Sequence, residues 1–338
     1  MAIEIIATGR AIPAKRLTNH DLASRLDTTD EWIRSHTGIG ARHIAEEGVA
    51  ASDLALEAAW NALAMAAEQR GVTKETLVQS LDLIILGSTS PDYYGVPSTA
   101  CIVQDKLGVR NAAALDICAA CSGFIYGLEL AAGFLALNAS RKRALVIGAE
   151  ILSRIADWND RGTAVLFGDG AGAVLIEQTE PSGGGRRGLL RSMLRADGSG
   201  AESLIIRQGG SRNPYHGTGD ERPPRVEMDG RAVYNFAVKA LIGTIETLLA
   251  GENLTIHDVA RIIPHQANAR IVQAAAKRLK IPESKFFLNI EEYANTSAAS
   301  IPIALDELNR AGGLQPGDLI MTIGFGGGLT YGGNLIVW

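Results

Sequence analysis

The sequence predicts a layered α/β protein made of two similar halves, and three observations lead to this prediction. Short runs rich in Ile, Leu and Val, typical of buried strands, alternate with alanine-rich segments at helical spacing. The order of these segments in residues 81–176 returns in residues 259–338, which indicates an internal repeat. Glycine is frequent, with 38 among 338 residues, as tight strand-to-helix turns and closely packed helices favour.

The strands are predicted from continuous apolar runs, which are typical of sheets buried on both faces. The first run, "MAIEIIATGR", opens the chain. The others occupy residues 81–89, 143–150, 164–178, 261–266 and 318–327. Helical spacing is clearest in residues 51–71 and 269–280.

The glycine-rich segment 180–188 is the natural boundary between the halves. We therefore expect halves of residues 1–182 and 183–338, each contributing a sheet to one shared core. The longest polar interruption, residues 207–230, is rich in Gly, Pro and Asn and is predicted to be a surface loop. His216 within it is interpreted as an exposed loop histidine.

Composition narrows the class of function. Hydrophobic residues make up 46% of the chain and charged residues 20%, as in soluble globular proteins. The net charge of −5 argues against nucleic-acid binding, which needs a long basic surface. Neither a signal peptide nor a run of about eighteen apolar residues is visible, so we expect no membrane span. Three cysteines are too few for a disulfide framework, so a reducing, cytoplasmic compartment is expected.

Two of the cysteines stand three residues apart in "LDICAACSGF". Cys121 is predicted at the N-terminus of a helix, where the dipole and unpaired N–H groups favour a thiolate and can hold an oxyanion. Cys118 is interpreted as a packed core residue, and a redox pair remains the alternative that the C-x-x-C spacing suggests. No second cluster joins these residues and Cys101 to complete a zinc site, so no metal is expected.

In the internal repeat, the segment that carries Cys121 corresponds to residues 286–300, which carry Asn295. His265 follows the apolar run 261–264 and precedes a predicted helix. Taken singly, a histidine here is as often a satisfied core group, and the asparagine an ordinary helix N-cap. As a set at equivalent turns, a thiol, an imidazole and an amide are expected to converge on one cavity.

Five motifs together resemble a known family. In order, "DTTDEWIRSHTGI", "DICAACSGF", "PHQANARI", "NTSAASIPIAL" and "GFGGGLTYGG" resemble β-ketoacyl-acyl carrier protein synthase III, the initiating condensing enzyme of bacterial fatty-acid synthesis. The resemblance implies a thiolase-like fold, a five-layered αβαβα sandwich of two pseudo-duplicated halves, usually as a homodimer. It also implies decarboxylative condensation of an acyl-coenzyme A primer with malonyl-acyl carrier protein, with the coenzyme A thioester as substrate and no separate cofactor.

The same resemblance implies roles for individual residues. Cys121 would be the acylated nucleophile, and His265 with Asn295 would decarboxylate the malonyl unit. The backbone N–H groups of Cys121 and Gly327 would form the oxyanion hole. The coenzyme A site would comprise Thr28, Trp32, Arg161 and Asn268.

A carrier-protein docking patch is expected on the helix after His265, because the acyl carrier protein is acidic. Arg270 and Lys277 are two helical turns apart and share a face, with Arg278 nearby. The alternative is an ordinary solvated helix face.

Three positions depart from the family pattern. Val96 stands where a phenylalanine often narrows the primer pocket, so a longer or branched primer is expected to fit. His36 replaces an arginine that contacts coenzyme A in many relatives, although Arg34 is close in sequence. Asn235 replaces a lysine that often helps carrier binding.

Three other functions remain to be weighed against initiation of fatty acids. A related condensing enzyme or acyltransferase of secondary metabolism would use a longer acyl chain. A thioester hydrolase would need a base that activates water, which Asn295 cannot supply. A non-catalytic assembly subunit is disfavoured, since the thiol, the imidazole and the amide are all present.

Overall fold

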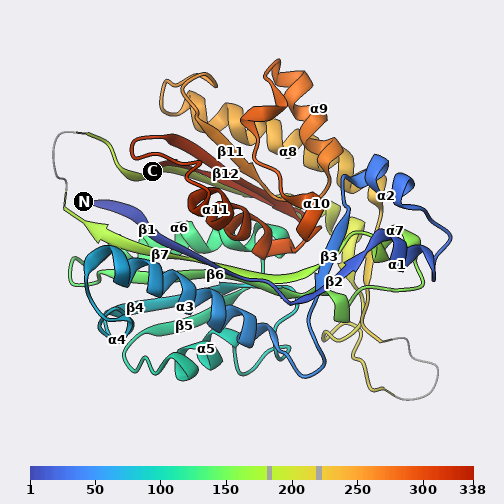
Figure 1. The fold of residues 1–338 in the computed structure, drawn as a ribbon, viewed down its shortest axis with the longest axis horizontal. Coiled ribbons are helices and arrows are strands. Elements are labelled where there is room, and N and C mark those ends of the chain that lie inside the picture. The colour runs from blue at the N-terminus through green and yellow to red at the C-terminus, as the bar shows by residue number, and fades with distance from the viewer. Residues whose placement is uncertain (181–184, 218–222) are drawn as a thin grey trace.

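Two large sheets lie one above the other in the computed structural model, which describes residues 1–180, 185–217 and 223–338 (Figure 1). The first sheet has the strand order β1-β7-β6-β4-β5 and the second β11-β12-β13-β8. The strands of the first sheet are β1 (Ala2–Ala11), β4 (Leu81–Gly87), β5 (Ala113–Ile117), β6 (Arg143–Ile151) and β7 (Asp169–Thr179). Those of the second sheet are β8 (Gly188–Ala196), β11 (Arg261–Pro264), β12 (Leu319–Gly326) and β13 (Thr330–Val337).

Helices cover both outer faces and fill the space between the sheets (Figure 1). On the first sheet's outer face lie α3 (Ala51–Arg70) and α5 (Thr99–Leu107). Between the sheets lie α6 (Gly123–Ala136) and α11 (Ser300–Arg310), and on the second sheet's outer face α8 (Gly230–Ala250) and α9 (Ala269–Leu279). The five layers confirm the predicted αβαβα sandwich.

Alanine and glycine set the spacing between α3 and the first sheet. Ala58, Ala59 and Ala62 of α3 are fully buried against β1 and β7. A Cβ atom on Gly9 of β1 would lie 2.3 Å from the carbonyl oxygen of Ala58, so strand and helix are in backbone contact there. The alanine-rich composition of α3 therefore reflects close packing.

Smaller elements connect the layers. They are β2 (Lys15–Thr18), α1 (Asn19–Ala23), α2 (Asp30–Thr37), β3 (Ala41–Ile44), α4 (Lys74–Val78), α7 (Arg161–Ala164), β9 (Leu204–Ile206), β10 (Val226–Met228) and α10 (Ile290–Tyr293). The strands β2 and β3 pair with each other, as do β9 and β10, both antiparallel.

The structure corrects two sequence predictions and shows one difference between the repeated halves. The strand predicted for residues 164–178 begins only at Asp169, because the Asp160 side chain accepts the N–H of Gly162 at 2.8 Å and starts α7 instead. The counterpart of β5 in the second half makes a single parallel bridge, from Phe286 to Ile262. The predicted surface loop 207–230 includes β10, which pairs with β9.

Two further expectations need comment. The boundary predicted between residues 182 and 183 lies outside the described residues, although the first sheet ends at Thr179 and the second begins at Gly188. Within the described chain, α8 is the one helix long and apolar enough to cross a membrane by length and composition. Its inner face, with Ala237, Leu241 and Leu248, packs on the second sheet, as in a core helix of a folded domain.

Candidate active site

Cys121 lies where the two halves meet. It occupies the 3-10 turn η1 (Ala120–Ser122), which follows β5 and leads directly into α6. A Cβ atom on Gly326, at the end of β12, would lie 2.6 Å from the backbone nitrogen of Cys121. Only a glycine at position 326 allows this approach. The predicted position of Cys121 at the start of a helix is confirmed.

Burial dominates the electrostatics of this thiol. Cys121 is 8% exposed, and desolvation raises the pKa of its thiol to about 12, although the Ser297 hydroxyl acts in the opposite direction. The helix start alone therefore does not make Cys121 a thiolate in the free protein. Stabilisation of the thiolate has to come from groups around it.

Cys118 is exposed, so its interpretation as a packed core residue is wrong. The residue follows β5, which is the last strand of its sheet, and the chain turns there toward α6. Among the described residues, no group of three or more His, Cys, Asp or Glu side chains is placed to hold a metal ion.

His265 follows β11 and is 2% exposed. Its Nδ1 atom lies 2.7 Å from the Ser300 hydroxyl, which also accepts the N–H of Gln266 at 3.4 Å. No other acceptor takes the Ser300 proton among the described residues, so Ser300 donates to Nδ1 and the ring proton resides on Nε2. Burial lowers the pKa of His265 to about 3, which makes the ring a neutral donor.

Asn295 precedes the 3-10 turn η5 (Ser297–Ala299) at the start of α11 and is 7% exposed. Its Oδ1 atom accepts the N–H of Ser297 at 2.8 Å, which leaves the amide N–H groups for the cavity. Its backbone N–H donates to the carbonyl of Leu166 at 2.9 Å, which ties this turn to the segment before β7. Asn295 is not the N-cap of α11, a position that Ala299 holds.

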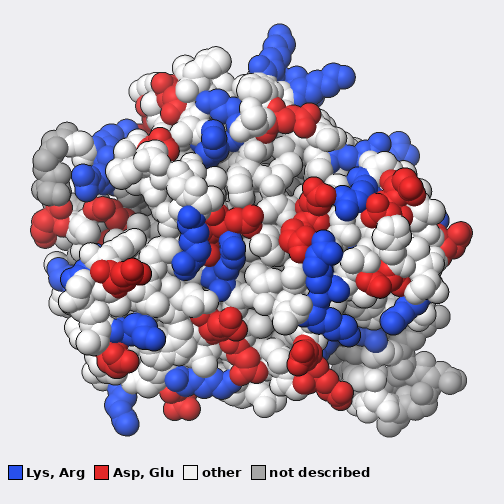
Figure 2. Space-filling view, in the orientation of Figure 1, with Lys and Arg blue, Asp and Glu red and all other residues white. Residues whose placement is uncertain are grey.

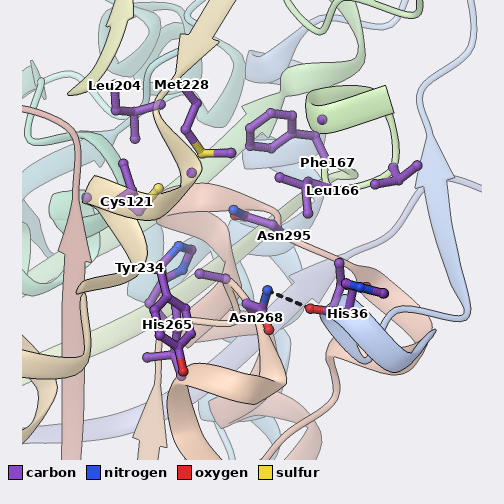
Figure 3. A pocket seen from close by; sticks show the side chains of 18 of the residues that line it. His36, Cys121, Leu166, Phe167, Leu204, Met228, Tyr234, His265, Asn268 and Asn295 are labelled. Atoms are coloured by element: carbon purple, nitrogen blue, oxygen red, sulfur yellow. Dashed lines mark hydrogen bonds between the residues drawn. The ribbon is translucent and has the colours of Figure 1, made fainter. Parts of the chain in front are cut away.

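These three side chains line one cavity of about 250 Å³. Figure 3 shows Cys121, His265 and Asn295 pointing into the same space, under apolar walls that include Leu204 and Met228. The structure confirms one predicted arrangement: a thiol, an imidazole and an amide converge on one cavity. Two neutral donors, the Nε2–H of His265 and the amide of Asn295, face the thiol's cavity.

The outer part of this cavity carries polar and aromatic groups. The guanidinium of Arg161 lies over the Trp32 ring, 4.7 Å from its centroid, and the His36 ring stacks on Trp32 at 4.4 Å. Asn268 caps α9 by accepting the N–H of Arg270 and donates to the carbonyl of His36 at 3.0 Å (Figure 3). Trp32, Arg161, His36 and Asn268 all line the cavity.

Two residues near this entrance do not line the cavity. Thr28 has a buried hydroxyl that finds no hydrogen-bond partner in the described part of the chain, and it follows Asp27, whose carbonyl accepts from Arg161 at 2.9 Å. Arg34 is held by Asp30 and Glu291, so it is not placed to substitute for the arginine that His36 replaces.

A second cavity of about 410 Å³ opens on the other side of Cys121. It shares Cys121, Phe167 and Leu204 with the first cavity, and Gly327 and Ser297 line it beside the thiol. Its other walls are mainly apolar: Leu152, Ile155, Ile205, Ile206 and Val226, with Cys118 and Tyr94. Val96 is 88% exposed and lines neither cavity of the single chain.

Sequence reasoning missed the contribution of β9 and β10 to both cavities. Leu204 and Met228 face the first cavity, and Leu204, Ile206 and Val226 face the second. The signals were the short apolar run "LII", which directly precedes the segment that was predicted to be only a loop, and "VEM", which lies inside that segment near its end.

The predicted docking residues are exposed on α9. Arg270 and Lys277 border a shallow surface groove beside Tyr234, and Arg278 lies next to it in sequence. No ion pair joins these three cations to an acidic side chain in the part of the chain that the structure describes. Figure 2 shows Lys and Arg side chains projecting at the top edge of the molecule, over α9. Asn235 is exposed on the neighbouring α8.

A sandwich of two such halves is the thiolase fold, and a cysteine facing a histidine and an asparagine is typical of the condensing enzymes built on it. The family models for 3-oxoacyl-[acyl-carrier-protein] synthase III match residues 115–198 and, for its C-terminal part, residues 249–338. The chain belongs to the β-ketoacyl-acyl carrier protein synthase III family, the condensing acyltransferases of fatty-acid biosynthesis.

Individual relatives agree with this assignment. The chain is 47% identical to the β-ketoacyl-[acyl-carrier-protein] synthase III of Caldanaerobacter subterraneus subsp. tengcongensis, covering 100% of this chain and 98% of the relative. It is 44% identical to that of Clostridium acetobutylicum, covering 100% and 99%. The crystal structure of 3-oxoacyl-[acyl-carrier-protein] synthase III from Aquifex aeolicus superposes with a TM-score of 0.88 at 41% identity, with both chains covered completely.

Proposed function

We propose that the chain condenses an acyl-coenzyme A primer with malonyl-acyl carrier protein, with Cys121 as nucleophile and His265 and Asn295 as the groups that stabilise the enolate. One observation carries the proposal: a buried thiol shares a cavity with two neutral N–H donors whose other atoms are already hydrogen-bonded. A hydrolase would need a base that activates water, and neither of these two donors is such a base.

In the first half-reaction the Cys121 sulfur attacks the carbonyl carbon of the primer thioester. The bond to the coenzyme A sulfur breaks, and coenzyme A leaves as a thiol with the proton that Cys121 gives up. The backbone N–H groups of Cys121 and Gly327 hold the oxyanion of the tetrahedral intermediate, since Gly327 lies beside the thiol.

In the second half-reaction the malonyl thioester loses carbon dioxide and becomes an enolate. Its oxygen accepts hydrogen bonds from His265 Nε2–H and from the Asn295 amide. Because the pKa of His265 is far below 7, the imidazole stabilises this charge without protonating the carbanion. The carbanion attacks the acyl carbon, and the Cys121 thiolate leaves and regains a proton from solvent.

The second cavity is proposed to hold the acyl chain of the primer. Its walls are apolar, and about 410 Å³ exceeds what an acetyl group fills. We keep Val96 as a determinant of primer size in the dimer. β5 is an edge strand, and the turn with Val96 lies next to it, because Asp116 of β5 accepts the N–H groups of Thr99 and Ala100. A homodimer that pairs this face would enclose Val96.

The coenzyme A and carrier sites follow from the entrance and from α9. Trp32 offers an aromatic face for the adenine and Arg161 a cation for the phosphates, with Asn268 and Thr28 at the edges of the same region. The exposed Arg270, Lys277 and Arg278 are proposed to dock the acidic carrier. A cytoplasmic location is proposed with these substrates.

The test is a turnover assay with malonyl-acyl carrier protein and primers of increasing chain length. We expect a 3-ketoacyl product and a mass increase on Cys121 equal to the acyl group, both lost in Cys121→Ala. Free acid as the only product, or condensation at the wild-type rate by Cys121→Ala, would overturn the proposal. A strong preference for acetyl would remove the role proposed for the second cavity.

A further inference from the structure

Glu150, near the end of β6, is a fully buried carboxylate that the proposed chemistry does not use. Six donors converge on it. The N–H groups of Thr89 and Ser90 donate at 3.0–3.1 Å, and that of Ala298 at 3.4 Å. The hydroxyls of Ser88, Thr89 and Ser90 supply the other three hydrogen bonds. No cation pairs with this carboxylate within the described ranges.

These contacts join two segments that are remote in sequence. Residues 88–90 follow β4 in the first half, and Ala298 belongs to η5 in the second half. The carboxylate therefore fixes η5 against the first sheet at the level of Cys121. Packing supports the same contact, because a Cβ atom on Gly148 of β6 would lie 2.2 Å from the carbonyl oxygen of Ala298.

Ser297, the first residue of η5, directly precedes Ala298, whose N–H donates to this carboxylate. It is 2% exposed and lines the second cavity with Cys121, and its hydroxyl has no hydrogen-bond partner of normal geometry among the residues that the structure describes. Burial raises the pKa of the Glu150 carboxyl, as it raises that of the Cys121 thiol, and the Ser297 hydroxyl acts against burial at both groups. Its backbone has φ of +47°, a left-handed conformation that serine rarely adopts.

The strained turn is held from both sides. The N–H of Ser297 donates to Asn295 Oδ1 at 2.8 Å, and the next N–H, that of Ala298, donates to Glu150. A carboxylate offers about four lone-pair sites, and the six donors around Glu150 already outnumber them. Glu150 therefore has enough donors without the Ser297 hydroxyl, which can donate to the sulfur instead.

We propose that the Ser297 hydroxyl is the hydrogen-bond donor that stabilises the Cys121 thiolate, and that Glu150 is a positioning residue that holds Ser297 in place. The inference rests on the proposed role of Cys121 as nucleophile. Burial of the thiol disfavours the thiolate, and the helix start alone does not offset this effect. The Ser297 hydroxyl would supply the missing stabilisation of the thiolate.

The groups around the sulfur have opposing effects, and this makes the inference testable. His265, which follows β11, lines the cavity of the thiol as a neutral ring, and Tyr94 and Cys118 border the second cavity. Glu150 accepts the N–H of Ala298, the residue after Ser297. The charge of Glu150 disfavours the thiolate, whereas its positioning of Ser297 favours it. Glu150→Gln removes the charge and also replaces one accepting oxygen with an NH2 donor, so both effects are lost together, and the sign of the change in alkylation shows which effect dominates.

The experiment measures the pH dependence of Cys121 alkylation by iodoacetamide, with the modified residue identified by mass spectrometry. Ser297→Ala and Ser297→Gly both remove the hydroxyl, and glycine also relieves the left-handed backbone. Both are expected to alkylate about tenfold more slowly at pH 8, since a hydrogen bond to a charged group is lost. Wild-type alkylation in both variants, or in Ser297→Gly alone, would overturn the role of the hydroxyl.

Glu150→Gln tests the positioning role. Slower alkylation than in the wild type is expected, with no further loss when Ser297→Ala is added; faster alkylation would mean that the charge, not the positioning, matters. Asp169→Asn is the matched control, because Asp169 is a buried carboxylate held by Ser153 and by the N–H of Ala45, and it should not shift the profile. If Glu150→Gln does not fold, the two Ser297 variants still decide the inference. Failure of the proposed function would appear separately, as absence of Cys121 acylation by acyl-coenzyme A in the wild type.

Discussion

The Nδ1 atom of His265 lies 2.7 Å from the hydroxyl oxygen of Ser300, the first residue of α11. The contact therefore joins α11, which lies between the sheets, to a residue that follows β11 of the second sheet. It fixes which ring nitrogen carries the proton, and therefore which one can donate to an enolate.

We predict that Ser300→Ala slows decarboxylation of malonyl-acyl carrier protein about tenfold, because the imidazole then loses its preference for the Nε2–H tautomer. Acylation of Cys121 by acyl-coenzyme A should be unchanged, since the proposed mechanism does not use His265 in that step. Single-turnover measurement of each half-reaction checks the split. Ser122→Ala is the control, because Ser122 is a buried serine that donates to the carbonyl of Thr330; equal loss in both half-reactions would contradict the prediction.

Burial of His265 also predicts a pH dependence of stability. Its pKa is about 3 in the folded protein, against an ordinary value of 6.5, so below pH 6.5 the unfolded chain binds a proton that the folded protein does not. The free energy of unfolding should then fall by about 1.4 kcal/mol per pH unit from this group as pH drops from 6.5 toward 3.

Urea unfolding of His265→Asn between pH 7 and pH 4 checks this pH dependence. The free energy of unfolding of the variant should not show the part of the decline that comes from His265. The difference in free energy of unfolding between wild type and variant should therefore shrink as pH falls. The matched control is His36→Asn, an exposed histidine stacked on Trp32. A parallel decline in wild type and His265→Asn would show that the imidazole is not buried in its neutral form.

The close approach of the two halves at Cys121 predicts a severe effect of Gly326→Ala. The added methyl group would lie 2.6 Å from the Cys121 backbone nitrogen and 3.0 Å from its Cβ atom, and neither atom belongs to a flexible side-chain end. A displacement of about 1 Å at a reacting group costs about 100-fold in rate. The rate of Cys121 acylation, measured by mass spectrometry, should therefore fall about 100-fold.

Gly133→Ala in α6 is the control for Gly326→Ala. No atom lies within 4 Å of a Cβ added at Gly133, and alanine is the better helix former, so stability should hold or rise by about 1 kcal/mol. Full acylation activity in Gly326→Ala would contradict the geometry assigned to the junction of the halves.

The two halves and the convergence of Cys121, His265 and Asn295 were predictable because their signals are local. Apolar runs mark the strands, alanine spacing marks α3, Cys121 and His265 each follow a strand and precede a helix, and Asn295 shortly precedes α11. The exposure of Cys118 was not predictable, since it depends on β5 being an edge strand. Strand order is set by pairings between distant segments.

Other parts of the site had weaker signals in the sequence. β9 and β10 are three residues long, too short to show any periodicity, yet they build walls of both cavities. Glu150 ends an apolar run that predicts only a strand. Its donors come from residues 88–90 and from Ala298, so its role emerges only when the halves pack together.

The exposed cations of α9 give the last prediction. Arg270 and Lys277 share a face and border one groove, and no carboxylate pairs with them in the described part of the chain. An acidic carrier protein would gain from both charges, whereas the site proposed for acyl-coenzyme A lies beside Trp32 and Arg161. Lys277→Glu should therefore raise the KM for malonyl-acyl carrier protein about tenfold and leave kcat and the KM for acyl-coenzyme A unchanged. Lys142→Glu, an exposed lysine before β6, is the control for net charge. Added salt should raise the wild-type KM toward that of Lys277→Glu, since exposed charges are screened. An equal rise in KM from Lys142→Glu would place the carrier elsewhere.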